Sequence, residues 1–193
     1  MKVGVLSVQG AVSEHLDHLR RCNTEAVAVK DVQSLDEVSG LILPGGESTT
    51  IGKLIDIFGL ADSIRQRTEN GSLALFGTCA GMVLLAGEIT DGIVNQPKLG
   101  LMNIVVKRNA FGRQRESFET EIDFKTFKEP LTAVFIRAPI ILNMGSKVEV
   151  LAKLPEGTVA ARQGNLLATS FHPELTSDLR VHQYFVEMCN EIR

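Results

Sequence analysis

Apolar residues in the first half of the chain alternate between short continuous runs and positions spaced for one face of a helix. The runs predict buried strands at residues 3–8, 26–29, 41–43 and 73–76. Helical spacing follows the first run at Val12, Leu16 and Leu19, and follows the third at Ile51, Leu54, Ile55 and Phe58. Ser48 or Thr49 can cap the second of these helices, and another helix is expected within residues 79–86. The alternation predicts a mostly parallel open sheet with helices on both faces.

The second half has a different pattern. Apolar and acidic residues alternate through residues 118–124, which predicts a half-exposed strand in antiparallel pairing. Further strands are expected at residues 132–136, 148–152, 159–162 and 166–171. A last helix carries Val181, Tyr184, Phe185 and Met188 on one face. The chain shows no repeat and no linker, so we expect one mixed α/β domain over residues 1–193.

Composition narrows the function classes. The chain has 193 residues, 44% hydrophobic, with a formal net charge of −3, which argues against a nucleic-acid binder. We expect no secretory leader, because the first apolar run is too short for one, and no apolar run is long enough to cross a bilayer. The cysteines are Cys22, Cys79 and Cys189, an odd number that suits a reducing cytoplasm. Their spacing predicts no zinc site, and we expect no cofactor.

The segment Gly77-Thr78-Cys79-Ala80-Gly81 has the form G-x-C-x-G between a predicted strand and a predicted helix. This resembles a nucleophile elbow, in which small neighbours allow a sharp turn and the helix N-terminus favours a thiolate. The alternative is a buried structural cysteine. The hypothesis therefore needs a base elsewhere in the chain.

His172 is the best candidate for that base. It ends a predicted strand, and Pro173 holds it extended, so that Glu174 can lie on the same side and fix the ring tautomer. The alternative is a loop histidine beside an unrelated surface glutamate. The other histidines, His15, His18 and His182, are expected at the surface of the first and last helices.

Three further segments can contribute to a site at the same sheet edge. The strand–turn sequence LILPGGES at 41–48 ends in glycines whose backbone N–H groups can form an oxyanion hole. It matches neither the P-loop nor the dinucleotide fingerprint, so nucleotide binding is not supported. Arg108 and Arg137 can pair with a carboxylate of a small substrate, although each can equally be a surface charge.

Taken together, the segments resemble the glutaminase subunits of pyridoxal 5′-phosphate synthases, which are class I triad glutamine amidotransferases. The likeness covers essentially the whole chain. It is carried by GVLSVQGAVSEH at 4–15, LILPGGESTTIGKL at 41–54, GTCAGM at 77–82, RNAFGRQ at 108–114, FIRAP at 135–139 and SFHPELTSDLRVHQYF at 170–185. The segments RNAFGRQ and FIRAP single out this subfamily. Asn103, Arg115 and Glu116 are less typical of it.

The resemblance implies a flavodoxin-like fold, a catalytic triad and a protein partner. Cys79 would be the nucleophile, His172 the general base and acid, and Glu174 its orienting carboxylate. Glutamine binding would involve Gly46, Glu47, Ser48, Arg108, Ile136 and Arg137. The oxyanion hole would use backbone N–H groups near Gly46 and at Ala80. The partner would be the larger synthase subunit, a (β/α)8 barrel in a large hetero-oligomer, which receives the ammonia.

Other interpretations stay open on the sequence. The chain can be the glutaminase of another ammonia-dependent synthase, or a regulatory subunit of the same fold that has lost catalysis. A cysteine hydrolase or chaperone of a related flavodoxin-like fold is a third possibility, although it gives no reason for the two arginine segments.

Overall fold

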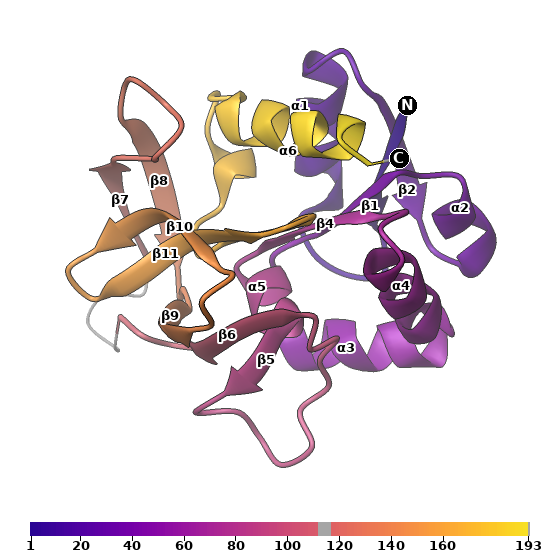
Figure 1. The fold of residues 1–193 in the computed structure, drawn as a ribbon, viewed down its shortest axis with the longest axis horizontal. Helices are drawn as coiled ribbons and strands as arrows, with labels where there is room; N and C mark the ends of the chain where they lie inside the picture. Colours follow the sequence, from indigo (N-terminus) through magenta and orange to yellow (C-terminus); the bar gives the residue numbers. More distant parts are fainter. Residues whose placement is uncertain (112–116, 193) are drawn as a thin grey trace.

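A twisted central sheet runs through the protein (Figure 1). The computed structural model describes residues 1–111 and 117–192. Within them the sheet has the strand order β2-β1-β3-β4-β12-β11-β9-β6-β5, with β10 paired to β11. Its strands are β1 (Lys2–Leu6), β2 (Glu25–Val29), β3 (Gly40–Leu43), β4 (Ala74–Thr78), β5 (Ala86–Ile89), β6 (Met102–Lys107), β9 (Ile140–Met144), β10 (Glu149–Leu154), β11 (Gly157–Gln163) and β12 (Leu166–Thr169).

The sheet is mixed and mostly parallel, as predicted. Strands β2, β1, β3, β4 and β12 are joined by parallel pairings, and β5 also pairs parallel with β6. Strands β11, β9 and β10 enter through antiparallel pairings. The five parallel strands β2-β1-β3-β4-β12 have the order of a flavodoxin-like sheet. Their carboxyl ends therefore form one edge, and ligands bind at this edge in such folds.

A separate two-stranded sheet consists of β7 (Ser117–Ile122) and β8 (Leu131–Ile136), which pair antiparallel with Phe118 opposite Phe135. This confirms the antiparallel pairing expected from the alternating pattern. The hairpin lies at the side of the molecule away from α3 and α4 (Figure 1). Strand β8 nevertheless reaches the sheet edge described below.

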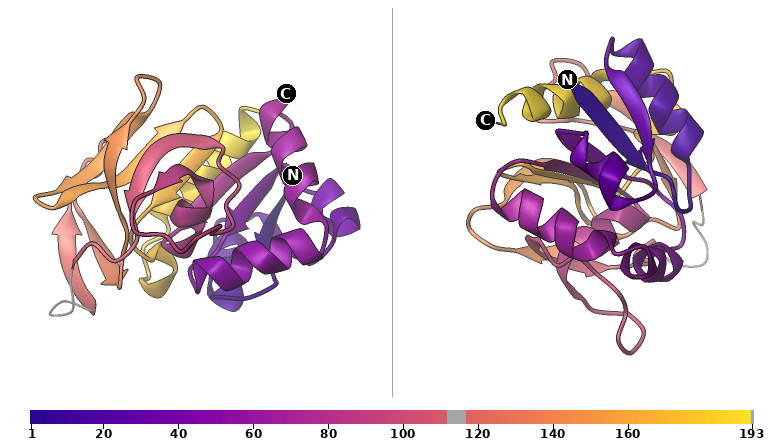
Figure 2. Two further views of the ribbon diagram at one scale, coloured as in Figure 1. Left: turned by 90° about the horizontal axis from the view of Figure 1, so that it is seen from below. Right: turned by 90° about the vertical axis from the view of Figure 1, so that its right-hand side faces the viewer.

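Helices cover both faces of the main sheet, which confirms the predicted layering (Figures 1 and 2). Helices α1 (Val12–Arg21) and α6 (Arg180–Asn190) lie on one face. Helices α3 (Ser48–Ile57), α4 (Leu60–Glu69) and α5 (Ala80–Leu85) lie on the other. The short helix α2 (Val32–Asp36) follows β2, and the 3-10 turn η1 (Pro173–Leu175) follows β12. No helix in the described part of the chain is both long and apolar enough to span a bilayer.

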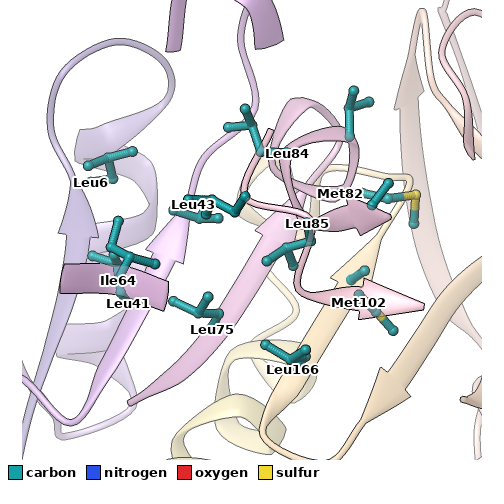
Figure 3. Packing of buried hydrophobic residues seen from close by; sticks show 14 of the residues in the cluster. Leu6, Leu41, Leu43, Ile64, Leu75, Met82, Leu84, Leu85, Met102 and Leu166 are labelled. Atoms are coloured by element: carbon teal, nitrogen blue, oxygen red, sulfur yellow. The ribbon is translucent and has the colours of Figure 1, made fainter. Parts of the chain in front are cut away.

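Strand alternation divides the core into two clusters. On β3, Leu41 and Leu43 face the cluster under α3, α4 and α5, whereas Ile42 faces the cluster under α1 and α6. Figure 3 shows part of the first cluster, in which Leu75 and Ile64 lie near these leucines. Each fully buried side chain of this size contributes about 1.5–3 kcal/mol by leaving water. This burial on both faces makes the strands short continuous apolar runs.

Two expectations about element ends were wrong in detail. Helix α3 is capped by Glu47, whose carboxylate accepts hydrogen bonds from the backbone N–H groups of Thr49 and Thr50, and Ser48 is already helical. The first and last predicted strands end two residues early, at Leu6 and Thr169, because the chain there turns into the loops that form the site. The elements α2, α4, β5, β6 and β9 had not been predicted.

Candidate active site

Cys79 lies in a sharp turn between β4 and α5. Its backbone has φ 48° and ψ −100°, a conformation that L residues rarely adopt. The flanking glycines allow this turn: a Cβ on Gly77 would overlap the backbone of Gly81, and a Cβ on Gly81 would overlap the carbonyl of Leu43. The spacing G-x-C-x-G therefore has a steric cause. The strained turn holds the cysteine at the carboxyl edge of the sheet.

His172 is held at the same edge by backbone contacts. It follows β12, and its N–H donates to the carbonyl of Val134 in β8 over 2.8 Å. Its ring Nδ1 lies 2.7 Å from Oε1 of Glu174, which is 3% exposed. Because a carboxylate only accepts hydrogen bonds, Nδ1 donates and Nε2 is left to face other groups. The sequence thus brings the H-P-E histidine and carboxylate together as expected.

Electrostatics favour the charged form of His172. Burial alone would lower its pKa, but hydrogen bonds and charge interactions with Cys79 and Glu174 outweigh burial and raise the pKa to about 10. Burial also opposes ionisation of Glu174, yet the neighbouring histidines hold the pKa of this carboxyl below its usual range. An ionised carboxylate, a cationic imidazole and a thiol in this order form an arrangement that can activate the sulfur as a nucleophile.

Gly45 makes room for the imidazole. A Cβ at this position would overlap the ring of His172, so only glycine lets the β3–α3 loop pass this close. Cys79 itself is fixed by its N–H, which donates to Thr169 of β12 over 2.8 Å, while its Sγ lies 3.8 Å from the carbonyl oxygen of Ile136. Loops from four strands therefore meet around one sulfur.

These groups line a pocket of about 400 Å³, a size suited to a small molecule. Every predicted site residue except Glu174 is in its wall, and Glu174 lies behind His172. The wall consists of Gln9, Gly46, Glu47, Ser48, Cys79, Ala80, Val83, Arg108, Asn109, Ile136, Arg137, Pro139 and His172. Ala80 is the first residue of α5, so its N–H is among those left without an intrahelical partner.

Hydrogen bonds through Gln96 connect polar side chains of the pocket wall. Arg108 donates to Gln96 over 2.9 Å and to Glu47 over 3.4 Å, and Gln96 donates to the hydroxyl of Ser48 over 3.1 Å. Hydrogen bonds from the start of α3 hold the pKa of Glu47 below its usual value, although partial burial opposes this. Arg137, which is exposed and has φ 42°, also lines the pocket. Arg108 and Arg137 thus both line the pocket.

The sequence interpretation named neither Gln96 nor Gln9 as a site residue. Gln9 lies in the pocket wall, and its Oε1 accepts from the N–H of Glu47 over 3.2 Å. Its position after β1, at the carboxyl edge, was the signal that it belongs to the site. Gln96 lies in the connection between β5 and β6, and its sequence carries no such signal.

The expectation for the remaining histidines was wrong. His15 and His182 are fully buried and His18 is 4% exposed, because α1 packs this face against α6 and the turn after β12. His15 shares the face of Leu19, four residues on, but charged neighbours mask the pattern.

Two further expectations, on the end of the RNAFGRQ segment and on metal binding, are limited by which residues the structure describes. Gly112, Arg113 and Gln114 of the RNAFGRQ segment, with Arg115 and Glu116, lie outside the described residues. Among residues 1–111 and 117–192, no group of three or more His, Cys, Asp or Glu side chains could hold a metal ion.

Comparison with known proteins gives a consistent family match. The model of the SNO glutamine amidotransferase family matches residues 5–191. The chain is 55% identical over 190 residues to "Pyridoxal 5'-phosphate synthase subunit PdxT" of Pelotomaculum thermopropionicum, covering 98% of this chain and 95% of that one. The protein of the same name from a Geobacillus strain is 51% identical over 193 residues, with 100% and 99% covered.

Solved structures agree. A crystal structure of a glutamine amidotransferase superposes with a TM-score of 0.93 at 51% identity, covering 97% of this chain and 98% of that one. A glutamine amidotransferase from Thermotoga maritima gives a TM-score of 0.64 at 15% identity, covering 99% and 83%, which shows a shared fold alone.

Proposed function

The chain belongs to the SNO glutamine amidotransferase family, and from this premise we propose that it is the glutaminase subunit of a pyridoxal 5′-phosphate synthase. The proposal treats residues 1–193 as one glutaminase domain. The observation that carries it is the placement of Cys79 and His172 in one pocket wall, with Glu174 hydrogen-bonded to Nδ1 of the imidazole.

The proposed reaction is hydrolysis of the side-chain amide of L-glutamine in two steps. The Cys79 thiolate attacks the amide carbon, the carbon–nitrogen bond breaks, and His172 gives its proton to the leaving nitrogen, which departs as ammonia. The product is a glutamyl thioester on Cys79. Water then attacks the thioester carbon while His172 takes a proton, and glutamate leaves as the thiolate is restored. Glu174 keeps the ring oriented and stabilises its charged form.

The pocket wall supports binding of glutamine. Arg108 and Arg137 provide the positive charge that a substrate carboxylate requires, and Gly46, Glu47, Ser48 and Ile136 complete the proposed contacts. Each tetrahedral intermediate places negative charge on the former carbonyl oxygen. The backbone N–H groups of Gly46 and Ala80 are the proposed oxyanion hole.

The proposed partner is the larger synthase subunit, a (β/α)8 barrel, which receives the ammonia. Ammonia becomes protonated in neutral water and then loses its nucleophilicity, so direct transfer to the partner protects it. Gln9 lies in the wall of the open pocket, which makes the loop after β1 a candidate contact. We therefore expect glutaminase activity to depend on the synthase subunit.

Glutamate release measured with and without the synthase subunit tests this function. We expect release to increase on adding the subunit, and Cys79→Ala to abolish it while leaving the fold intact, because the variant has no sulfur to form the thioester. A Cys189→Ala variant is the matched control. Burial raises the pKa of Cys189 to about 12, so this thiol is inert and its loss leaves the rate unchanged.

Two outcomes would contradict the proposal. Undiminished glutamate release by Cys79→Ala would exclude the thioester route. An active chain that responds to a different ammonia-dependent synthase, and not to the pyridoxal 5′-phosphate synthase subunit, would keep the chemistry and reject the partner.

A further inference from the structure

A chain of buried polar side chains continues inward from the proposed triad. Behind Glu174, Oε2 of its carboxylate lies 3.5 Å from Nε2 of His15. His15 Nδ1 in turn lies 2.9 Å from Nε2 of His182. Both histidine side chains are fully buried, and they come from α1 and α6, which cover one face of the sheet. Neither residue is in the pocket wall.

Hydrogen-bond accounting restricts where the protons lie. Among the described residues, Glu174 Oε2 and His182 Nδ1 are the buried side-chain polar atoms without a hydrogen-bond partner. The first is an acceptor only, and Nε2 of His15 lies 3.5 Å from it and 3.4 Å from the hydroxyl oxygen of Thr78. A proton on His15 Nε2 would therefore point an N–H at the otherwise unpaired carboxylate oxygen.

This choice determines the next tautomer. If His15 carries its proton on Nε2, its Nδ1 must accept, so His182 donates from Nε2 and keeps a bare lone pair on Nδ1. The opposite order would place the lone pair of His15 Nε2 against the carboxylate. It would also leave His182 with a buried N–H that has no acceptor. A buried unsatisfied donor is costly, so the first order is the one the geometry favours.

We propose that His15 is a positioning residue for the site, whose Nε2–H faces Glu174 Oε2 and holds the carboxylate so that Oε1 orients His172. His182 acts one step further away, since its Nε2–H fixes the tautomer of His15. The inference rests on the proposed glutaminase function for its effect on rate. The order of protons stands on the contacts alone.

The surroundings keep His15 neutral, which is why its tautomer matters. Burial lowers the pKa of His15 to about 4, against the attraction of Glu174 and Glu14, and the charges of His172 and His18 act in the same direction as burial. Burial also lowers the pKa of His182, and its closeness to His15 and His18 acts in the same direction. At neutral pH each ring therefore carries one proton.

Two substitutions of His15 distinguish the loss of its N–H group toward Glu174 from the loss of its ring. In His15→Gln the side-chain amide nitrogen can take the place of ring Nε2, so the N–H toward Glu174 is kept. In His15→Asn the shorter amide reaches only the Nδ1 position, and the N–H toward Glu174 is lost. With the synthase subunit present, we expect kcat for glutamate release to fall about tenfold in His15→Asn, with KM unchanged, and to stay within about threefold in His15→Gln.

Nuclear magnetic resonance of the ¹⁵N-labelled chain tests the proton order without any turnover. We expect His15 and His182 both to carry the proton on Nε2, and the Nδ1–H signal of His172 to shift in His15→Asn but not in His15→Gln. A proton on His15 Nδ1 in the unmodified chain would overturn the proposal, and so would equal loss of kcat in the two variants when both are folded. If the chain releases no glutamate at all, the proposed function fails, whereas the tautomers and the His172 signal still decide the positioning role.

Discussion

His172 and His15 contact different oxygens of the same carboxylate. The surroundings of His172 favour its charged form, whereas those of His15 keep it neutral. His172 lies 2.7 Å from Oε1 of Glu174 and has its pKa raised to about 10. His15 lies 3.5 Å from Oε2 and has its pKa lowered to about 4. Burial opposes the charged form of both rings, so burial alone does not account for the difference.

The two rings differ in charge because each has a different second neighbour besides Glu174. His172 faces Cys79 and the pocket, so the sulfur of Cys79 and the carboxylate of Glu174 both favour its proton. His15 faces a second neutral imidazole in the interior, and the single carboxylate at 3.5 Å does not offset complete burial. One carboxylate thus serves a charged ring on the pocket side and a neutral ring on the core side. The predictions below alter Glu174, then the pocket side, then the core side.

Replacing Glu174 by Gln should have the largest effect, because it removes the charge that both rings share. The amide can still accept from His172 but no longer stabilises the imidazolium, and it can present its NH₂ group to the wrong atom. We expect glutamate release to fall by about 10²–10⁴-fold. Titration of His172 by nuclear magnetic resonance should show its pKa falling below about 10.

The same titration distinguishes this effect from unfolding, since a folded variant keeps resolved ring signals for His15 and His182. A Glu174→Gln protein that releases glutamate within threefold of the unmodified rate would show that the shared carboxylate is not part of the mechanism.

Gly45→Ala changes the pocket side alone. Its Cβ would overlap the His172 ring, which must move away from Cys79 or force the β3–α3 loop to shift. We expect a loss of about 10–100-fold in glutamate release, because displacements near 1 Å can cost this much. The tautomers of His15 and His182 should remain as they are.

Gly71→Ala is the control for backbone effects on stability. Gly71 has φ +79° and nothing within 4 Å of an added Cβ, so the substitution strains the turn, at about 1–2 kcal/mol, without touching the pocket. Equal losses of activity in the two variants would attribute the effect of Gly45→Ala to instability.

The pocket side was largely predictable from the sequence, and the core side was not. Glycines around Cys79 and the proline after His172 are local signals, because the strained turn and the extended histidine require those residue types within a few positions. The parallel sheet was also predictable from local sequence, because strands that are buried on both faces are short apolar runs.

His15 shows why the rest could not be predicted. Its partners, Glu174 and His182, are more than 150 residues away in sequence, and only the packing of α1 against α6 and the turn after β12 brings them together. A histidine among charged residues has the pattern of a surface position until that packing is known. The Glu47 cap and the link from Arg108 to Gln96 are likewise products of tertiary contacts.

The smallest effect expected is on the core side, in the pH dependence of stability. Between the ordinary histidine pKa of 6.5 and about 4, an unfolded chain protonates residue 15 while the folded protein does not. Unfolding then takes up protons, so stability falls as the pH falls, by up to about 1.4 kcal/mol per pH unit for His15. His172 acts on the other side of neutrality: its raised pKa adds stability below 6.5 that is lost as the pH rises through about 10.

His15→Gln should therefore flatten the acid limb and leave the alkaline limb unchanged, because glutamine does not titrate. Urea unfolding at pH 5, 6 and 7 measures the first limb, and unfolding at pH 8 and 9 measures the second. His182 and Glu174 also lose stability in acid, so the variant keeps part of the slope. An acid limb as steep in His15→Gln as in the unmodified chain would mean that the folded protein accepts a proton on His15, and the contrast between the two sides of Glu174 would disappear.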